Sequence, residues 1–107
     1  MRDAIPPGTL DMLILRTLLY GSAHGREIGK HIQRTTNDFL QMQHGSLYPA
    51  LHRLEQQGWI SAKWMKTSTG REAKFYQLTR AGAQQLEKEL ADWRRLSHAV
   101  GLVIEMS

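Results

Sequence analysis

The stretch HGSLYPALHRLEQQGWI, residues 44–60, decides how the rest of this chain is interpreted. Leu47, Leu51 and Leu54 recur at helical spacing, and Ala50 falls in the same stripe. An apolar stripe with this period is the side of a helix that packs on a core. The sequence therefore predicts a short amphipathic helix with one side buried.

Two residues bound this helix. Proline is tolerated in the first turn and breaks a helix interior, so Pro49 places the start just upstream and the helix over residues 46–57. Gly58 ends it, and Trp59 begins a different structure. The side opposite the apolar stripe carries polar and amphipathic residues, and either water or a partner covers them. They are Ser46, Tyr48, His52, Arg53 and Gln56.

Length and composition set broad limits. A chain of 107 residues suits one domain with a modest core. It contains no run of eighteen apolar residues that would span a membrane, and its N-terminus lacks the features of a signal peptide. It has no cysteine, which excludes disulfides and thiolate metal sites. We expect a cytoplasmic protein.

The positive charge is concentrated in one segment. Net charge is +4, and residues 52–80 hold six basic side chains against two acidic ones. A local basic excess is typical of a nucleic-acid-binding surface, although a solvated face with a few extra lysines gives the same pattern.

The remaining segments complete the order of a winged helix-turn-helix. Thr9 is expected to cap a first helix that ends near residue 20, and a second helix is expected over about 24–34, with Ser22 or His24 as its cap. After the helix at 46–57, WISAKWMK and EAKFYQLT flank a loop of about five residues containing Gly70, which predicts a β-hairpin. The hairpin aromatics are expected in the core; these are Trp64, Phe75 and Tyr76.

Thr79 is expected to cap a last helix over residues 79–104. Its seam residues follow one another at alternating intervals of three and four, the a/d pattern of a coiled coil. The seam could fold back on the chain's own core, but the regular repeat favours contact with a second chain. The predicted dimer contacts are Leu86, Leu90, Trp93, Val100 and Ile104.

Catalysis has no support in the sequence. No histidine pair with a neighbouring acid has the spacing of a zinc-binding helix, and no glycine-rich phosphate loop follows a strand. No serine lies in a nucleophile elbow, and the carboxylates are scattered. We therefore expect neither an enzyme nor a metal site or cofactor.

DNA binding agrees better with the pattern. One helix fits the major groove, with its back on the domain and polar side chains toward the bases, as predicted for residues 46–57. Arg53 suits guanine or phosphate, and His52 and Gln56 suit base edges. A hairpin beside the groove would contact phosphates through Lys66, Arg71 and Lys74. For any single one of these residues, a plain solvated position is the alternative.

Three motifs in this order resemble the PadR family of bacterial transcriptional regulators. They are GTLDMLILRTLLYGSAHGREIGKHI, GSLYPALHRLEQQGWI and STGREAKFYQLTRAG, and the resemblance covers nearly the whole chain. It implies a winged-helix DNA-binding domain, a homodimer built by the C-terminal helix, and a repressor relieved by a small effector. The length resembles the short subfamily with a single C-terminal helix. Arg26 departs from the family, which usually has an aromatic residue there, so its role stays open.

The prediction is a mainly α fold with a small β-hairpin: a winged helix-turn-helix domain over residues 1–78 and a dimerisation helix over 79–107. Its partners would be double-stranded DNA with an inverted-repeat operator, a second copy of the chain, and a small aromatic effector near Trp93. The competing hypothesis is a winged-helix module that binds a protein and not DNA.

Overall fold

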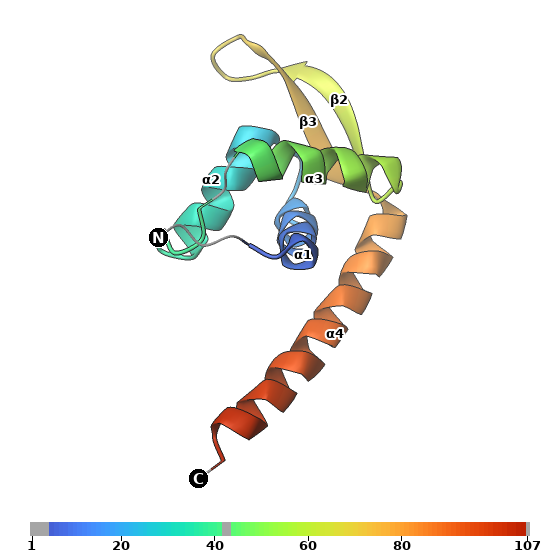
Figure 1. The fold of residues 1–107 in the computed structure, drawn as a ribbon. Helices are drawn as coiled ribbons and strands as arrows, with labels where there is room; N and C mark the ends of the chain where they lie inside the picture. Colours follow the sequence, from blue (N-terminus) through green and yellow to red (C-terminus); the bar gives the residue numbers. More distant parts are fainter. Residues whose placement is uncertain (1–4, 42–43, 107) are drawn as a thin grey trace.

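The computed structural model describes residues 5–41 and 44–106. The elements run in the order α1 (Pro7–Leu18), β1 (Ala23–His24), α2 (Gly25–Thr35), α3 (His44–Gln56), β2 (Ile60–Lys66), β3 (Glu72–Leu78) and α4 (Arg80–Ile104). Figure 1 shows α1 below α3, the β2–β3 hairpin standing on the other side of α3, and α4 leading away from the domain. The predicted fold class, a winged helix-turn-helix with a long C-terminal helix, is confirmed. None of the helices in the described ranges is long and apolar enough to cross a membrane.

The helix starts differ in part from those predicted. Thr9 is not the cap of α1: the helix begins at Pro7 with Pro6 as its N-cap, because proline at the first helical position loses no hydrogen bond and has the right φ. The predicted cap of α2 is confirmed for His24. Its ring accepts a hydrogen bond from the Glu27 N–H, and the Glu27 carboxylate accepts one from the His24 N–H.

Helix α3 begins at His44, two residues earlier than predicted, so Pro49 lies inside it and not in its first turn. A proline here removes the hydrogen bond to the carbonyl of Gly45, four residues earlier. Both residues are exposed, and water can satisfy that carbonyl. The predicted start of α3 was wrong because it assumed that Pro49 must lie in the first turn. A proline on the solvent side of a helix can also lie farther inside. The end of the predicted α2–α3 connection, residues 42–43, lies outside the described residues.

The hairpin is confirmed, with a connection over residues 67–71 in which Gly70 takes a left-handed φ of 86°. Strands β2 and β3 are antiparallel, from Ile60 opposite Leu78 to Lys66 opposite Glu72. Strand β1 was not predicted; it pairs with β3 and gives the sheet order β1-β3-β2. A two-residue strand carries no measurable alternation, so periodicity cannot find it.

One core joins the helices to the sheet. The predicted α3 stripe is fully buried, and α1 lies at the centre of the packing. The core residues with 4% exposure or less are Leu10, Ile14, Leu15, Leu18, Ile28, Ile32, Leu47, Ala50, Leu51, Leu54, Ile60 and Leu86. Tyr76 is buried and Phe75 half-buried as expected, but Trp64 is 65% exposed and does not belong to the core. Trp64 lies in the outer half of β2, where the inner side of the hairpin borders an open groove and not the packed core.

Helix α4 is fixed at its first turns and extends away afterwards. Thr79 caps it as predicted: its hydroxyl accepts from the Gly82 N–H and donates to the Gly58 carbonyl. Leu86 is 2% exposed within the chain's own core, so its assignment to a dimer face is corrected. Residues 91–100 are all exposed, because the domain is shorter than this helix.

Candidate nucleic-acid interface

The outer face of α3 is polar and open. Pro49, His52 and Gln56 are exposed on the side opposite the buried leucines, and Ser46 is exposed near the start of the helix. A helix that buries one side and presents short polar groups on the other has the form required for insertion into a groove.

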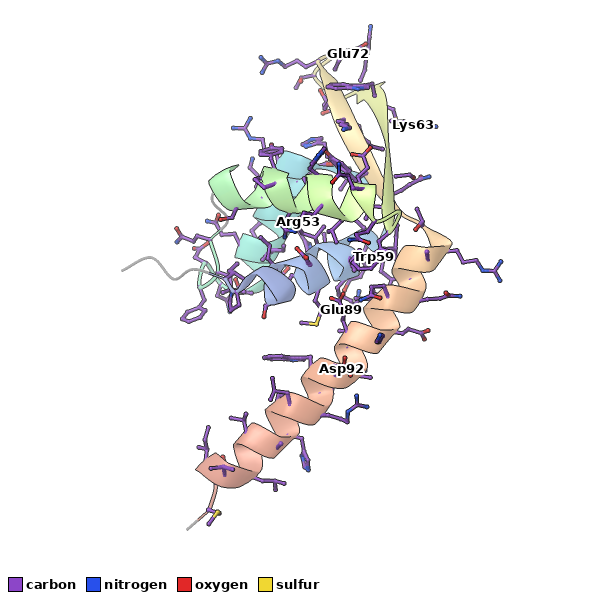
Figure 2. All side chains as sticks on the ribbon, turned by 45° about the vertical axis from the view of Figure 1, so that its right-hand side comes forward. Arg53, Trp59, Lys63, Glu72, Glu89 and Asp92 are labelled. Carbon is purple, nitrogen blue, oxygen red and sulfur yellow. The ribbon has the colours of Figure 1, made fainter. Side chains whose placement is uncertain are left out.

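One flank of α3 is tied to α1 by an ion pair. Arg53 Nη2 lies 2.7 Å from Asp11 Oδ1, with the two side chains 48% and 20% exposed. Burial raises the pKa of the Asp11 carboxyl above its ordinary value, while the charge of Arg53 and its hydrogen bond act in the opposite direction. The guanidinium predicted to read DNA is thus directed toward α1 in this structure (Figure 2).

The other flank of α3 is tied to the hairpin. Lys74 Nζ on β3 donates to Glu55 Oε1 at 3.1 Å and lies 5.7 Å from the centre of the Tyr76 ring. The hydrogen bond to Glu55 raises the pKa of the Lys74 amine. Lys74 therefore links two elements of the interface in addition to carrying charge. Neither acidic partner could be predicted from the sequence, because Asp11 is 42 residues from Arg53 and Glu55 is 19 residues from Lys74.

Tyr48 joins α3 to the start of α2. A Cβ placed on Gly25 would lie 2.8 Å from Cε1 of the Tyr48 ring, so the ring packs directly on the glycine backbone. The side chain is 45% exposed overall. A side chain at position 25 would therefore displace the ring, which lies at the edge of the open α3 face.

The hairpin tip carries two of the predicted cations. Lys66 ends β2 and Arg71 lies in the connection, and both are exposed. The tip is ordered by hydrogen bonds from Thr67 N–H to the Arg71 carbonyl and from Gly70 N–H to the Thr67 carbonyl. The fold thus brings the predicted α3 residues and the hairpin cations to adjoining elements, with Arg53 on the flank away from the hairpin.

The structure also forms a groove that the sequence did not predict. This groove of about 740 Å³ lies between the inner side of the hairpin, Tyr48 and the first turns of α2. Arg26, Lys30 and Trp64 line it together with the predicted Arg71 and Lys74. Among Arg26, Lys30 and Trp64, only Arg26 stood out in the sequence as a possible interface residue, because it differs from the PadR pattern.

Comparison with known proteins assigns the fold to a family. The model of the transcriptional regulator PadR-like family matches residues 14–88. The chain belongs to the PadR-like family of transcriptional regulators. Such regulators act by binding DNA and are not enzymes.

Individual relatives agree with this assignment. An uncharacterized protein of Lysinibacillus sphaericus is 31% identical over 105 residues, which covers 98% of this chain and 96% of that protein. The negative transcriptional regulator PadR of Bacillus subtilis is 32% identical over 84 residues, but these cover 78% of this chain and only 44% of that regulator. The crystal structure of a PadR-like transcriptional regulator from Bacillus cereus matches with a TM-score of 0.81 at 26% identity, covering 94% of this chain and 95% of that one.

The distal half of α4 gives this PadR-like chain a long apolar surface. Of the predicted dimer residues beyond Leu86, Leu90 packs partly on the core, whereas Trp93, Val100 and Ile104 are 46%, 46% and 71% exposed. Leu96 and Val103, which the strict seam passes over, are 58% and 70% exposed. Between Trp93 and Val100, the predicted a/d repeat falls on position 97, which is a serine. A repeat through positions 93, 96, 100 and 103 also alternates intervals of three and four, and all four of its residues are apolar.

The described residues form no candidate metal site. No group of three or more histidine, aspartate or glutamate side chains among them could hold an ion. Asp11, Glu89, Asp92 and Trp93 line a hollow of about 230 Å³ between α1 and α4.

Proposed function

We propose that this protein is a transcriptional repressor of the bacterial cytoplasm that binds an inverted-repeat operator as a homodimer. Helix α3 enters the major groove, the hairpin contacts the phosphate backbone, and the distal half of α4 forms the dimer. The observation that carries the proposal is the open polar face of α3 beside a basic hairpin, in a chain of a DNA-binding family.

His52 and Gln56 are the proposed base-reading residues, since both project from the exposed side of α3. Ser46 and Tyr48 lie nearer the start of that helix and suit contacts at the groove edge. Arg53 has the secondary role of a backbone contact, because it must first leave Asp11 to approach DNA.

Lys66 and Arg71 at the hairpin tip are the proposed phosphate contacts, which position the protein without reading sequence. Lys74 has a supporting role: its ion pair with Glu55 holds the hairpin against α3 and so helps to position the two tip cations. The sign of regulation rests on one relative: the Bacillus subtilis protein is named a negative transcriptional regulator.

The test needs an operator, obtained by selecting bound duplexes from a random pool. Affinity for this operator and for a scrambled duplex is then measured at three salt concentrations. We expect the double variant His52→Ala, Gln56→Ala to lose about 1–3 kcal/mol per altered contact on the operator while binding scrambled DNA normally. Arg71→Ala should weaken both duplexes and reduce the log–log salt slope by about one per contact per subunit.

Lys63→Ala is the matched control for Arg71→Ala. It removes the same charge from the outer side of β2, which Figure 2 shows directed away from α3. Equal losses on both duplexes for every variant would mean that α3 does not read sequence. Failure of the wild-type protein to bind any duplex would favour the protein-interaction module instead.

Trp93 is the proposed contact for an aromatic effector. Its ring is half exposed above the hollow between α1 and α4, close to where a second α4 would pack. In the double variant Trp59→Phe, Trp64→Phe, Trp93 is the remaining tryptophan, and planar aromatic compounds should change its fluorescence. An unchanged spectrum across the series would leave Trp93 as a packing residue of the dimer.

A further inference from the structure

The groove between the hairpin and α2 carries further cations and an aromatic ring beside Arg71 and Lys74, the two of its cations that the contacts proposed above already use. Four cationic side chains line it against two carboxylates, those of Glu27 and Glu72. Glu27 is engaged in the cap of α2, where it accepts the His24 N–H. The basic residues are Arg26, Lys30, Arg71 and Lys74.

These cations divide into a floor and a rim. Lys74 is held at the floor by Glu55, and Tyr48 closes the floor toward α2 by packing on Gly25. Arg26, Lys30 and Arg71 are exposed, and none of them takes part in the ion pairs found among residues 5–41 and 44–106. Exposed cations therefore stand on both walls: α2 supplies Arg26 and Lys30, and the hairpin supplies Arg71, next to the carboxylate of Glu72.

Trp64 forms the apolar part of the hairpin wall. It is 65% exposed and stands opposite Lys74 in the strand register, so the indole faces the groove and not the outer side where Lys63 lies. An exposed indole among cations offers a flat apolar surface next to anion-binding groups. Deoxyribose and phosphate alternate in the same way along a DNA strand.

We propose that this groove grips one strand of the bound duplex from both sides, with Arg26 and Lys30 on its phosphates and Trp64 against a deoxyribose. The proposal rests on the proposed DNA-binding function and assigns it three further residues. Arg26 and Lys30 are four residues apart on α2, so they lie on one side of the helix with their Cβ atoms about 5–6 Å apart. They can therefore contact neighbouring phosphates. Through Tyr48 the groove is continuous with the α3 face that would lie in the major groove.

The charge arrangement favours a strand over a small anion. A small anion is bound where several donors converge on one point, whereas these cations stand on two opposed walls of an open groove. A DNA strand running between the walls satisfies both at once. It also explains why an arginine is acceptable at position 26, where an aromatic ring would add no charge.

The experiment compares Arg26→Ala and Lys30→Ala with Arg34→Ala. Arg34 is an exposed cation of the same helix that lies outside the groove, near the opposite end of α2. Binding to the selected operator and to scrambled duplex is measured at three salt concentrations. We expect each of the first two variants to weaken both duplexes in equal proportion and to lower the salt slope by about one per subunit, with Arg34→Ala unchanged.

Trp64 gives an independent readout. Trp64→Ala should weaken binding several-fold without altering the salt slope, because an uncharged contact releases no counterions. Trp64→Phe should keep most of the affinity. Thermal unfolding of each variant shows that the fold is intact, which is expected because all three side chains are exposed.

The outcomes separate this proposal from the function on which it rests. If the wild-type protein binds no DNA, the proposed function itself has failed. If it binds, and the Arg26→Ala and Lys30→Ala slopes equal that of Arg34→Ala, the groove does not hold a strand. A change confined to the binding of inorganic phosphate would make it a small-anion site and overturn the proposal.

Discussion

Arg53 shows how one residue can serve the fold and the interface together. Its guanidinium is held by a carboxylate of α1, yet almost half of the side chain remains in contact with solvent. A pair this exposed contributes only about 0–1 kcal/mol to stability. Such a pair can exchange for a phosphate at modest cost, which is consistent with the secondary role proposed for Arg53 at the DNA backbone.

The Asp11–Arg53 pair predicts a pH dependence of stability. Because the folded state raises the pKa of Asp11 above 3.8, the unfolded chain releases this proton first, and stability falls as pH rises from that value through the folded pKa. Arg53→Ala removes the opposing charge, so the Asp11 pKa should rise further and stability at pH 7 should fall by about 0.5–1 kcal/mol. Carboxyl NMR titration and urea unfolding at pH 4 and 7 measure both effects.

Asp11→Asn is the control for this prediction. It removes the titrating group while leaving an amide oxygen that can accept from Arg53, so the acid-range slope assigned to Asp11 should disappear. An Asp11 pKa that stays constant or falls in Arg53→Ala would show that the pair has no influence on the carboxyl.

For single residues, the sequence predicted which side chains are buried better than it predicted which side chains form ion pairs. The leucine stripe of α3 is an intrinsic property of a periodic segment, and it is buried as expected. The partners of Arg53 and Lys74 come from other elements, and the local sequence contains no information about which acid the fold will bring near. The prediction that Trp64 lies in the core was wrong for a related reason, because its exposure depends on how the hairpin is placed against the helices.

At the scale of elements, the hairpin and α4 are closely packed where they join. The Trp59 carbonyl accepts the Thr79 N–H at 3.1 Å, and Gly82 of α4 lies against the same carbonyl. A Cβ on Gly82 would lie 1.9 Å from the Trp59 oxygen. The contact is with backbone and not with the end of a flexible side chain, so neither partner can move aside alone.

Gly82→Ala should therefore destabilise the protein by about 2–4 kcal/mol, despite the usual preference of helices for alanine. The matched control is Gly8→Ala in α1, where a Cβ meets open space. That variant should be within about 1 kcal/mol of wild type, on the stabilising side. Urea unfolding gives both values, and a Gly82→Ala protein as stable as Gly8→Ala would contradict the close approach.

Elements with strong local signals were predicted well, and those fixed by tertiary context were not. The hairpin, with its glycine turn, and α4, with its threonine cap, match the expected ranges closely. The helix starts near proline differ from the expected ones by three residues in α1 and two in α3, and β1 exists only because β3 pairs with it. The open face of α3 could be predicted because it is the complement of the core stripe, but the groove on α2 could not.

For the whole molecule, the exposed distal half of α4 predicts a dimer. Burying each leucine-sized side chain contributes about 1.5–3 kcal/mol, so several per chain can offset an association cost of about 4–15 kcal/mol. Sedimentation at micromolar concentration should give twice the chain mass of 12.3 kDa. Val100→Lys should give the monomer.

His98→Lys is the control for the dimer prediction. It introduces the same charge two residues away, about 200° around the helix and therefore on the side opposite the apolar stripe. Leu90→Lys would be a poorer choice, because Leu90 also packs on the chain's own core. A wild-type monomer, or a dimer that Val100→Lys leaves intact, would remove α4 as the dimer interface.

A dimer with a two-fold axis fixes the geometry of the operator. The two α3 helices should read half-sites about one helical turn apart, roughly 34 Å or 10 base pairs. Inserting five base pairs between the half-sites turns one of them to the other side of the duplex, so affinity should fall to that of a single half-site. Val100→Lys, as a monomer, should bind the original and the lengthened operator equally and weakly. Wild-type binding that ignores the insertion would mean that α3 reads each half-site independently, without the constraint that α4 is proposed to impose.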